Sequence, residues 1–395
     1  MQRLQAFKYE LMPDGDRQRA MCCFAGSCRF VSNKALALQN TNHQAGNKFI
    51  GYVEMANLLP AWKREFPWLK DAPSQALQHA LKSLDRAFTN FFEKRSKYPR
   101  FKKRGYADSF RFPQGFELDH ANSRIFLPKL GWVRYRNSRE VLGEVRNVTV
   151  SHRNGKWFVS IQTAREVEKP AAQGEAVGID MGVVRFATLS DGTVVLPLNL
   201  FKRYAADLGK AQQAMSRKKK FSNNWKKAKA RIQRIHVRIA NARRDFLHKT
   251  STTISKNHAM VVMEDLQVSN MSRSAAGSLE QPGINVRQKA GLNRAILDQG
   301  WTEFRRQMEY KMLWAGGVFL AVPAQNTSRI CLGCGHVSAE NRPTQAEFRC
   351  VKCGFEENAD LVAAVNVLRA GHARLACQVN GDVSRQQQEP SERAA

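Results

Sequence analysis

Four cysteines near the C-terminal end of the chain have the spacing of a metal site. Cys331 and Cys334 form one C-x-x-C pair, and Cys350 and Cys353 form a second pair further along. A glycine follows the second cysteine of each pair, which lets the backbone turn tightly beneath a metal ion. Two such turns supply the four thiolates of a tetrahedral zinc site, so the spacing predicts a structural zinc ribbon.

Three acidic residues in or beside apolar segments are candidates for hydrolytic chemistry. Asp180 lies within VGIDMG, Glu264 ends MVVME, and Asp360 opens the segment ADLVAAVNVL. Burying an unpaired carboxylate is costly, so an acid in such a segment usually binds a cation or pairs with a basic side chain. Carboxylates suit Mg²⁺ or Mn²⁺, and two such ions clamp the attacking and leaving oxygens of a phosphodiester. If the fold brings the three acids together, they predict metal-dependent phosphodiester hydrolysis.

Taken singly, an acid at the end of a strand is more often a turn or capping residue. Asp191, in SDGT, fits that simpler interpretation and is assigned to a turn. Asp265 directly follows Glu264 and should point to the opposite face of the strand, so it is left outside the set. The order and context of the three acids, together with the zinc ribbon, favour the catalytic interpretation.

The composition of the chain indicates a polyanionic partner. The 395 residues include 63 Lys and Arg against 34 Asp and Glu, a formal charge of +29. Nucleic acid is the commonest partner of such a protein, and an anionic membrane is the alternative. No apolar run approaches the roughly 18 residues that span a bilayer, and the first residues lack the apolar core of a signal peptide. We therefore expect no membrane partner and a location in the prokaryotic cytosol, associated with the nucleoid.

The remaining cysteines are not spaced for the ribbon. We expect them to be reduced and partly buried rather than joined in disulfides, because nothing in the sequence points to secretion. They are Cys22, Cys23, Cys28 and Cys377.

Hydrophobic periodicity predicts the elements that must position these residues. Residues 4–11 favour a strand, residues 17–93 favour helices, and residues 115–165 favour an antiparallel sheet or barrel that can include the first strand. A linker at residues 167–175 separates this part from further strands that carry Asp180.

The second half of the chain begins with a predicted helical hairpin over residues 201–257, followed by a short strand that ends at Glu264. Residues 292–317 favour one amphipathic helix that glycines end, and residues 378–395 have the composition of a disordered tail. The seam of the hairpin is predicted from apolar residues at alternating three- and four-residue spacing. These are Ile232, Ile235, Ile239, Ala242 and Phe246.

The order of these motifs resembles the OrfB/TnpB family of transposon-encoded proteins, which are relatives of the compact type V CRISPR nucleases. The resemblance rests on GIDMG, VVMEDL, TSRICLGCG, CVKCGF and NADLVAAVNVL, and it extends over about residues 3–370. Further matches are CRFVSNKAL, YPRFKKRG, NARRDFLHK and WTEFRRQMEYKMLWAGG.

The resemblance implies an α/β nuclease domain with an RNase H-like (RuvC) fold, interrupted by a zinc ribbon that binds target nucleic acid. It also implies an N-terminal wedge β-barrel that carries an inserted helical recognition lobe with a helix-turn-helix-like start. The implied parts are the barrel at 1–12 and 113–168, the lobe at 13–112, the nuclease domain at 172–325 and 357–377, and the ribbon at 326–356.

The resemblance also implies a role for each candidate site residue. Asp180, Glu264 and Asp360 match the catalytic acids that bind magnesium, and the four ribbon cysteines match the zinc ligands. One departure is Val362, which stands where the family often has asparagine, although Asn366 remains. We expect this change to weaken hydrogen bonding around Asp360 without removing a metal ligand.

Two basic segments are candidates for binding nucleic acid. The first half of the predicted hairpin has no acidic residues to pair with its lysines and arginines. Phosphates would relieve the repulsion between these positive charges, which favours nucleic-acid binding. The alternative is a helix face that is exposed to solvent and binds nothing. Residues 94–104 mix cations with Tyr98 and Phe101, which suits phosphate contacts and base stacking unless these rings plug the neighbouring sheet. The candidate contacts are Lys218, Lys219, Lys220, Lys226, Lys227, Lys229, Arg231 and Arg234 in the hairpin, and Lys97, Arg100, Lys102 and Lys103 in the loop.

Taken together, the resemblance implies an RNA-guided, Mg²⁺-dependent DNA endonuclease. Its guide RNA would come from the transposon end, its target would be double-stranded DNA beside a short adjacent motif, and it would act as a monomer within a ribonucleoprotein. One alternative is a transposase that joins DNA strands itself, since RNase H-like folds support both reactions. A nucleic-acid-binding regulator with an inactive nuclease is the other, but it would require the loss of an acid, and all three are present.

Overall fold

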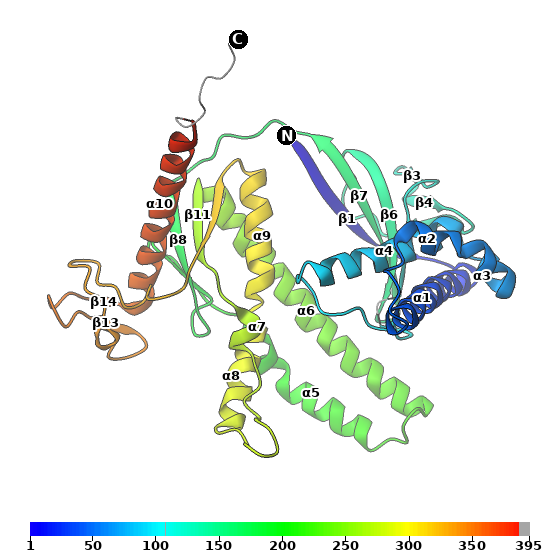
Figure 1. Cartoon of the computed structure of the whole chain (residues 1–395). Helices are drawn as coiled ribbons and strands as arrows, with labels where there is room; N and C mark the ends of the chain where they lie inside the picture. Colours follow the sequence, from blue (N-terminus) through cyan, green and yellow to red (C-terminus); the bar gives the residue numbers. More distant parts are fainter. Residues whose placement is uncertain (107, 387–395) are drawn as a thin grey trace, which may run out of the picture. The chain divides into compact units, whose positions relative to one another are not determined.

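The computed structural model describes residues 1–106 and 108–386 of the chain (Figure 1). It consists of two compact units, Met1–Glu168 and Lys169–Ala395, and each is described by itself. Among the described residues, no helix combines the length and apolar character needed to cross a membrane.

A seven-stranded antiparallel sheet forms the centre of the N-terminal unit, in the order β2-β6-β7-β1-β5-β4-β3. The predicted first strand lies inside this sheet, where β1 pairs with β7 and β5. A hairpin turn joins β6 and β7 through Asn154 and Gly155, whose φ angles of 53° and 79° are those that a tight two-residue turn needs. The strands are β1 Gln2–Met12, β2 Ser109–Phe112, β3 Glu117–Asp119, β4 Arg124–Leu127, β5 Gly131–Tyr135, β6 Glu144–Arg153 and β7 Lys156–Glu166.

Helices occupy the segment between β1 and β2, as predicted. Asp14 caps the first helix, because its side chain accepts a hydrogen bond from the backbone N–H of Arg17 at 2.8 Å. The last helix buries Leu77, Leu81 and Leu84 along one face, which fixes it against the core of the unit. The elements are α1 Gly15–Gln44, α2 Tyr52–Asn57, α3 Leu59–Glu65, the 3₁₀ helix η1 Pro67–Lys70 and α4 Ser74–Phe92.

The C-terminal unit contains a five-stranded mixed sheet in the order β10-β9-β8-β11-β12. Strands β8, β11 and β12 are parallel, with β12 at one edge, whereas β9 and β10 are added antiparallel at the other edge. Successive residues of β11 are buried, as expected for a parallel strand that helices cover on both faces. The strands are β8 Ala176–Met181, β9 Ala187–Leu189, β10 Val194–Val195, β11 Met260–Glu264 and β12 Val318–Val322.

Different helices cover the two faces of this sheet (Figure 1). Val261 and Met263 pack in one cluster with residues of α9, whereas Met260 and Val262 pack in another with residues of α10. α5 and α6 form the predicted hairpin, and Ile235 and Ile239 of its seam are buried. The helices are α5 Leu200–Ser216, α6 Asn223–Asn257, α7 Val268–Met271, α8 Val286–Gln299, α9 Trp301–Trp314 and α10 Ala359–Gln386.

Two expectations for this unit need correction. The single helix predicted over residues 292–317 is two helices, because Gly300 has a left-handed φ of 75° that ends α8 and begins α9. A Cβ at Gly300 would also lie 3.1 Å from Cδ of Arg243, so this side chain would have to shift slightly to admit another residue. The last helix continues to Gln386, into the segment predicted to be disordered from residue 378, because no proline interrupts it there. The rest of that segment, 387–395, lies outside the described residues.

Candidate active site and metal centre

The fold brings the three predicted acids together. Asp180 and Glu264 lie on the adjacent parallel strands β8 and β11, in which Ile179 is paired with Met263, the residues directly before them. Asp360 lies in the first turn of α10, which packs against both strands. The negative charges of Glu264 and Asp360 both raise the pKa of Asp180, so the three carboxylates share one electrostatic environment.

The environment of Asp180 and Glu264 disfavours their charged forms in the absence of a cation. Burial, and then the charges of Glu264 and Asp360, raise the pKa of Asp180 to about 7. Burial also raises the pKa of Glu264, which is 8% exposed. A divalent cation would relieve this repulsion, and the carboxylate oxygens are the hard ligands that Mg²⁺ prefers. Among the described residues, however, the four ribbon cysteines are the one group of three or more possible ligands whose atoms all lie within 4.8 Å of one another, so the acids supply suitable donors but not a closed metal site.

Residues at the start of the ribbon and in the segment that follows it hold the acids in position. Thr327 Oγ1 donates a hydrogen bond to Glu264 Oε1 at 2.6 Å. Asn366 of α10 in turn donates its amide to the carbonyl of Thr327 at 2.8 Å, which ties the helix of Asp360 to the strand of Glu264. The backbone N–H of Asp360 donates to the side chain of Asn358 at 3.1 Å.

Two arginines that the sequence analysis did not single out lie beside the acids. Arg342 Nη2 is 3.6 Å from one oxygen of Asp360, and Arg185 Nη1 is 3.8 Å from the other. The charge of Arg342 also lowers the pKa values of Asp180 and Glu264, opposing their burial. Arg342 follows the short 3₁₀ helix η2 Ala339–Asn341 of the ribbon, so this insertion reaches the acids. No local motif could have shown it, because its role depends on how the ribbon folds back.

The acids that were left outside the set have other partners. Asp265 pairs with Arg305, and its side chain is 43% exposed. Asp191 accepts a hydrogen bond from the backbone N–H of Thr193 at 2.8 Å, as expected for its turn. Val362, the departure from the family pattern, is fully buried in an apolar cluster with Phe348 of the ribbon. It therefore packs beneath the ribbon.

The raised pKa of Asp180 predicts a pH-dependent cost to stability. A carboxyl group whose pKa rises on folding destabilises the folded state increasingly as the pH rises from about 4 to about 7. In magnesium-free buffer, Asp180→Asn should unfold several degrees above the wild type at pH 8, and this difference should shrink as the pH falls toward 4. Thermal unfolding at a series of pH values measures it. A difference that is constant with pH would contradict the assignment of this burial cost to Asp180.

The four ribbon cysteines converge as predicted. Their Sγ atoms all lie within 4.8 Å of one another. Cys331 and Cys353 are 3.6 Å apart, as are Cys334 and Cys350. Zinc–sulfur bonds of about 2.3 Å at tetrahedral angles place sulfur atoms about 3.8 Å apart, so these side chains fit a zinc ion. The ribbon is completed by the hairpin of β13 Glu347–Arg349 and β14 Glu356–Asn358.

The remaining cysteines are all free, which agrees with the expectation of reduced thiols. Their expected partial burial is wrong for three of them, because Cys22, Cys23 and Cys377 are exposed. Only Cys28 is buried, between α1 and α4, where its Sγ lies 3.4 Å from the carbonyl oxygen of Ala76.

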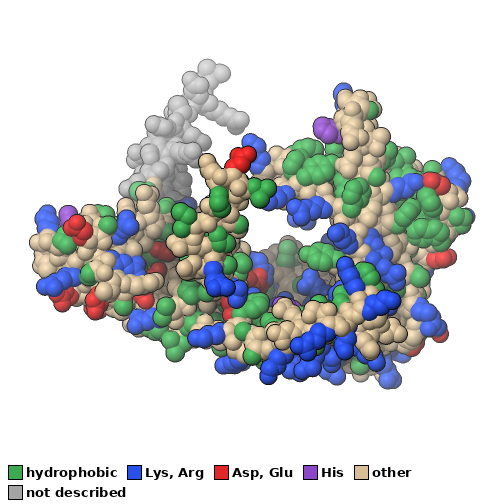
Figure 2. All heavy atoms as spheres, turned by 90° about the horizontal axis from the view of Figure 1, so that it is seen from below, with side chains coloured by type: hydrophobic (Ala, Val, Ile, Leu, Met, Phe, Trp, Pro, Cys, Tyr) green, Lys and Arg blue, Asp and Glu red, His purple; other side chains and the backbone are tan. Residues whose placement is uncertain are grey.

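The basic residues of the hairpin are not neutralised within the part of the chain that is described. None of the Lys and Arg side chains from 217 to 234 forms an ion pair there. Figure 2 shows a face of the molecule on which Lys and Arg side chains greatly outnumber acidic ones. This surface remains free for a polyanion.

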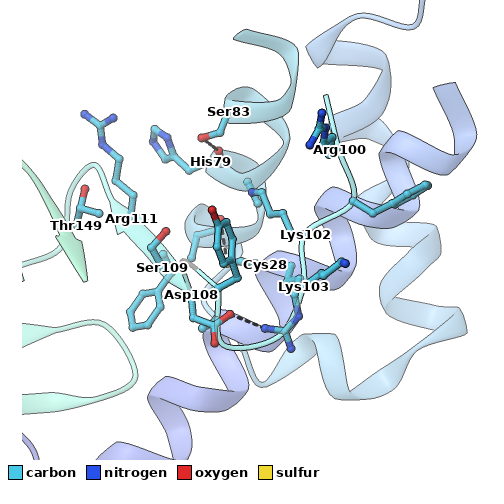
Figure 3. Close-up of a pocket in the computed structure, with 17 residues that line it drawn as sticks. Cys28, His79, Ser83, Arg100, Lys102, Lys103, Asp108, Ser109, Arg111 and Thr149 are labelled. Atoms are coloured by element: carbon cyan, nitrogen blue, oxygen red, sulfur yellow. Dashed lines mark hydrogen bonds and ion pairs between the residues drawn. The ribbon is translucent and has the colours of Figure 1, made fainter. Parts of the chain in front are cut away.

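Three of the four predicted cations of the basic loop line a cavity of about 950 Å³ in the N-terminal unit (Figure 3). Arg100, Lys102 and Lys103 project from the loop, opposite His79 of α4 and near Asp108, the one acid in the lining. Asp108 is already paired with an arginine of α1 at 2.6 Å, so the cavity is electropositive.

Lys97, the fourth predicted contact of the loop, does not line the cavity. The neighbouring rings do not plug the sheet: Tyr98 packs edge-on against Phe88 and Phe91 of α4, and Phe101 is 53% exposed. Tyr98 therefore packs on the helices and not into the sheet, whereas Phe101 lines the cavity beside Phe110 of β2, and the cations of the loop stay candidates for phosphate contacts.

Three family models match the chain. The OrfB_IS605 model, described as "Probable transposase", matches residues 147–275. A model described as "Cas12f1-like, TNB domain" matches residues 301–367, which include the ribbon. A model described as "Helix-turn-helix domain" matches residues 1–48.

The alignments with two similar proteins cover almost the whole chain. One, from Escherichia coli (strain K12), is named "Putative RNA-guided DNA endonuclease InsQ" and is 60% identical over 95% of this chain and 94% of its own length. Another, from Streptomyces pristinaespiralis, is named "Putative RNA-guided DNA endonuclease" and is 35% identical over 98% of this chain and 93% of its own length. Among solved structures, the Cas12f1 chain of a complex with sgRNA and target DNA has a TM-score of 0.52 at 13% identity, covering 93% of this chain and 99% of that one, which shows a shared fold.

Proposed function

The chain belongs to the OrfB/TnpB family of transposon-encoded proteins, and from this premise we propose that it is an RNA-guided DNA endonuclease. Its cutting site would be formed by Asp180, Glu264 and Asp360. The observation that carries the proposal is their meeting at one end of β8 and β11, beside the first turn of α10. In this proposal, the mixed sheet with its helices is the RNase H-like nuclease domain, and the seven-stranded sheet and α1–α4 are the wedge and the recognition lobe.

In the proposed reaction, the carboxylates, Thr327 and the two arginines have different roles. Magnesium ions bound by the three carboxylates would supply Lewis acidity toward the scissile phosphodiester and the attacking water. Thr327 holds one oxygen of Glu264, which fixes the direction of the other. Arg185 and Arg342 lie beside Asp360, where their charges would stabilise the negative charge that develops on the phosphate.

Sequencing of bound RNA tests the proposal most directly. The full chain should be expressed together with its transposon ends, purified, and its RNA sequenced. We expect one discrete RNA from the transposon end, and this complex should cut a matching double-stranded DNA in magnesium buffer. Deleting the transposon end from the expression plasmid is the control, and it should remove the discrete RNA. Protein without RNA that joins DNA strands would instead support the transposase.

A further inference from the structure

We propose that the end of the α5–α6 hairpin is a stacking site for an unpaired nucleobase of RNA. Its centre is a pair of rings, Phe221 and Trp225, which we call the aromatic tip. The inference rests on the proposed function, since it assigns a contact to the guide RNA. It differs from the phosphate contacts predicted for the hairpin, because it involves bases.

Each ring of the aromatic tip lies beside the other ring and beside a lysine. The ring centroids of Phe221 and Trp225 are 5.5 Å apart, with an angle of 59° between their planes. Lys220 Nζ lies 5.3 Å from the Phe221 ring, and Lys229 Nζ lies 5.2 Å from the Trp225 ring. Rings with cations beside them are the usual means by which proteins bind single-stranded nucleic acid: the rings stack on bases, and the cations contact phosphates.

Phe221 is not explained by the stability of the hairpin. Its side chain is 67% exposed, so it gains little from burial. Its φ angle of 70° is in the left-handed region, which is costly for a bulky residue and which glycine or asparagine would adopt more easily. Both effects disfavour phenylalanine at this position. Such a combination is characteristic of binding sites, where strain is retained for function.

The turn holds the rings in a fixed place. Ser222 Oγ accepts a hydrogen bond from the backbone N–H of Trp225 at 3.2 Å, which caps α6. The backbone N–H of Ser222 donates to the carbonyl of Lys219 at 3.1 Å. Because both sides of the turn are anchored, a base that stacks here loses little free energy to the ordering of the protein.

The positive charge around the aromatic tip favours nucleic acid as its partner. No acidic residue occurs in the sequence between Asp207 and Asp245, and the cations from 217 to 234 form no ion pair within the described chain. This field favours nucleic acid over an uncharged protein surface. The base must be unpaired, because the faces of bases inside a duplex are already covered by their neighbours.

Binding of three probes to the full chain tests the inference. The probes are a single-stranded RNA of about 12 nucleotides, an abasic sugar–phosphate chain of the same length, and a blunt RNA duplex. Replacing both rings with alanine (F221A/W225A) should weaken binding of the single strand roughly 10- to 100-fold, because one stacked base contributes about 1–3 kcal/mol. Binding of the abasic chain and the duplex should change less than about threefold, and the salt dependence should keep its slope.

Three control variants separate stacking from other effects. F221Y/W225F keeps both rings and should bind the single strand like the wild type. Leu313→Ala, which removes a comparably exposed apolar side chain from α9, should also leave binding unchanged. K226Q/K227Q should weaken binding of all three probes and, by removing two phosphate contacts, flatten the log–log salt slope by about 1.5 units.

Each other outcome has a definite meaning. If F221A/W225A binds the single strand as well as the wild type does, the rings do not stack on bases, and only this inference fails. An equal loss on the abasic chain would also overturn it, since the rings would then act through the fold of the hairpin. If the wild type binds no RNA at all, the proposed function fails together with the inference. A loss seen only with anionic lipid vesicles would assign the aromatic tip to a membrane surface and overturn the inference.

Discussion

Replacing Asp180 with alanine should reduce DNA cleavage roughly a thousandfold or more, while binding of RNA and DNA stays within a few-fold of the wild type. The half-buried carboxylate of Asp180 shares its electrostatic environment with Glu264 and Asp360, and alanine offers no metal ligand in its place. The basic segments that would bind nucleic acid lie elsewhere in the sequence. Cleavage of a guide-matched plasmid in magnesium buffer measures the first effect, and a filter-binding assay measures the second.

Asp265→Ala is the matched control for this experiment. Asp265 is adjacent in sequence to Glu264, but it pairs with Arg305 and is about half-exposed. Its loss should leave cleavage within about tenfold of the wild type, whereas Glu264→Ala and Asp360→Ala should behave like Asp180→Ala. Full cleavage by the Asp180 variant would remove this residue from the site. Equal losses for all four variants would mean that the assay reports folding.

Removal of the zinc site should abolish most of the cleavage although no zinc ligand touches the predicted cutting site. Cys331 and Cys350 pack in one apolar cluster with Ala359 and Val362, on either side of Asp360. Structural zinc sites supply much of the folding free energy of small ribbons. Without the metal, the ribbon should unfold and withdraw Arg342 from Asp360, lowering cleavage at least about tenfold.

Elemental analysis and cleavage assays on the same preparations test this expectation. The wild type should contain one zinc ion per chain, and C331S/C350S should contain none. The matched control is C22S/C23S, which changes two exposed thiols outside the ribbon and should keep both the zinc and the activity. A zinc-free wild-type preparation that remains fully folded and active would contradict a structural role for the metal.

The sequence was most informative where a residue conflicts with its surroundings. Asp180 could be found because a carboxylate is costly in an apolar strand, and the cysteines because zinc geometry fixes their spacing. Arg342 could not be found in this way, because an arginine is an ordinary residue in a polar loop. Its position beside Asp360 depends on the folded ribbon. The break at Gly300 was missed for a related reason. Apolar periodicity continues through it, and only the backbone conformation shows why glycine is needed there.

The order in which the three acids occur along the chain bears on its biosynthesis. They come from β8, β11 and the start of α10, and the ribbon is translated between the last two. A ribosome must therefore make nearly the whole protein before the cutting site can exist. A gene copy with a stop codon ahead of α10 would encode the N-terminal unit and the basic hairpin without Asp360. Under the proposed function, such a fragment would keep the segments that contact RNA but could not form the cutting site.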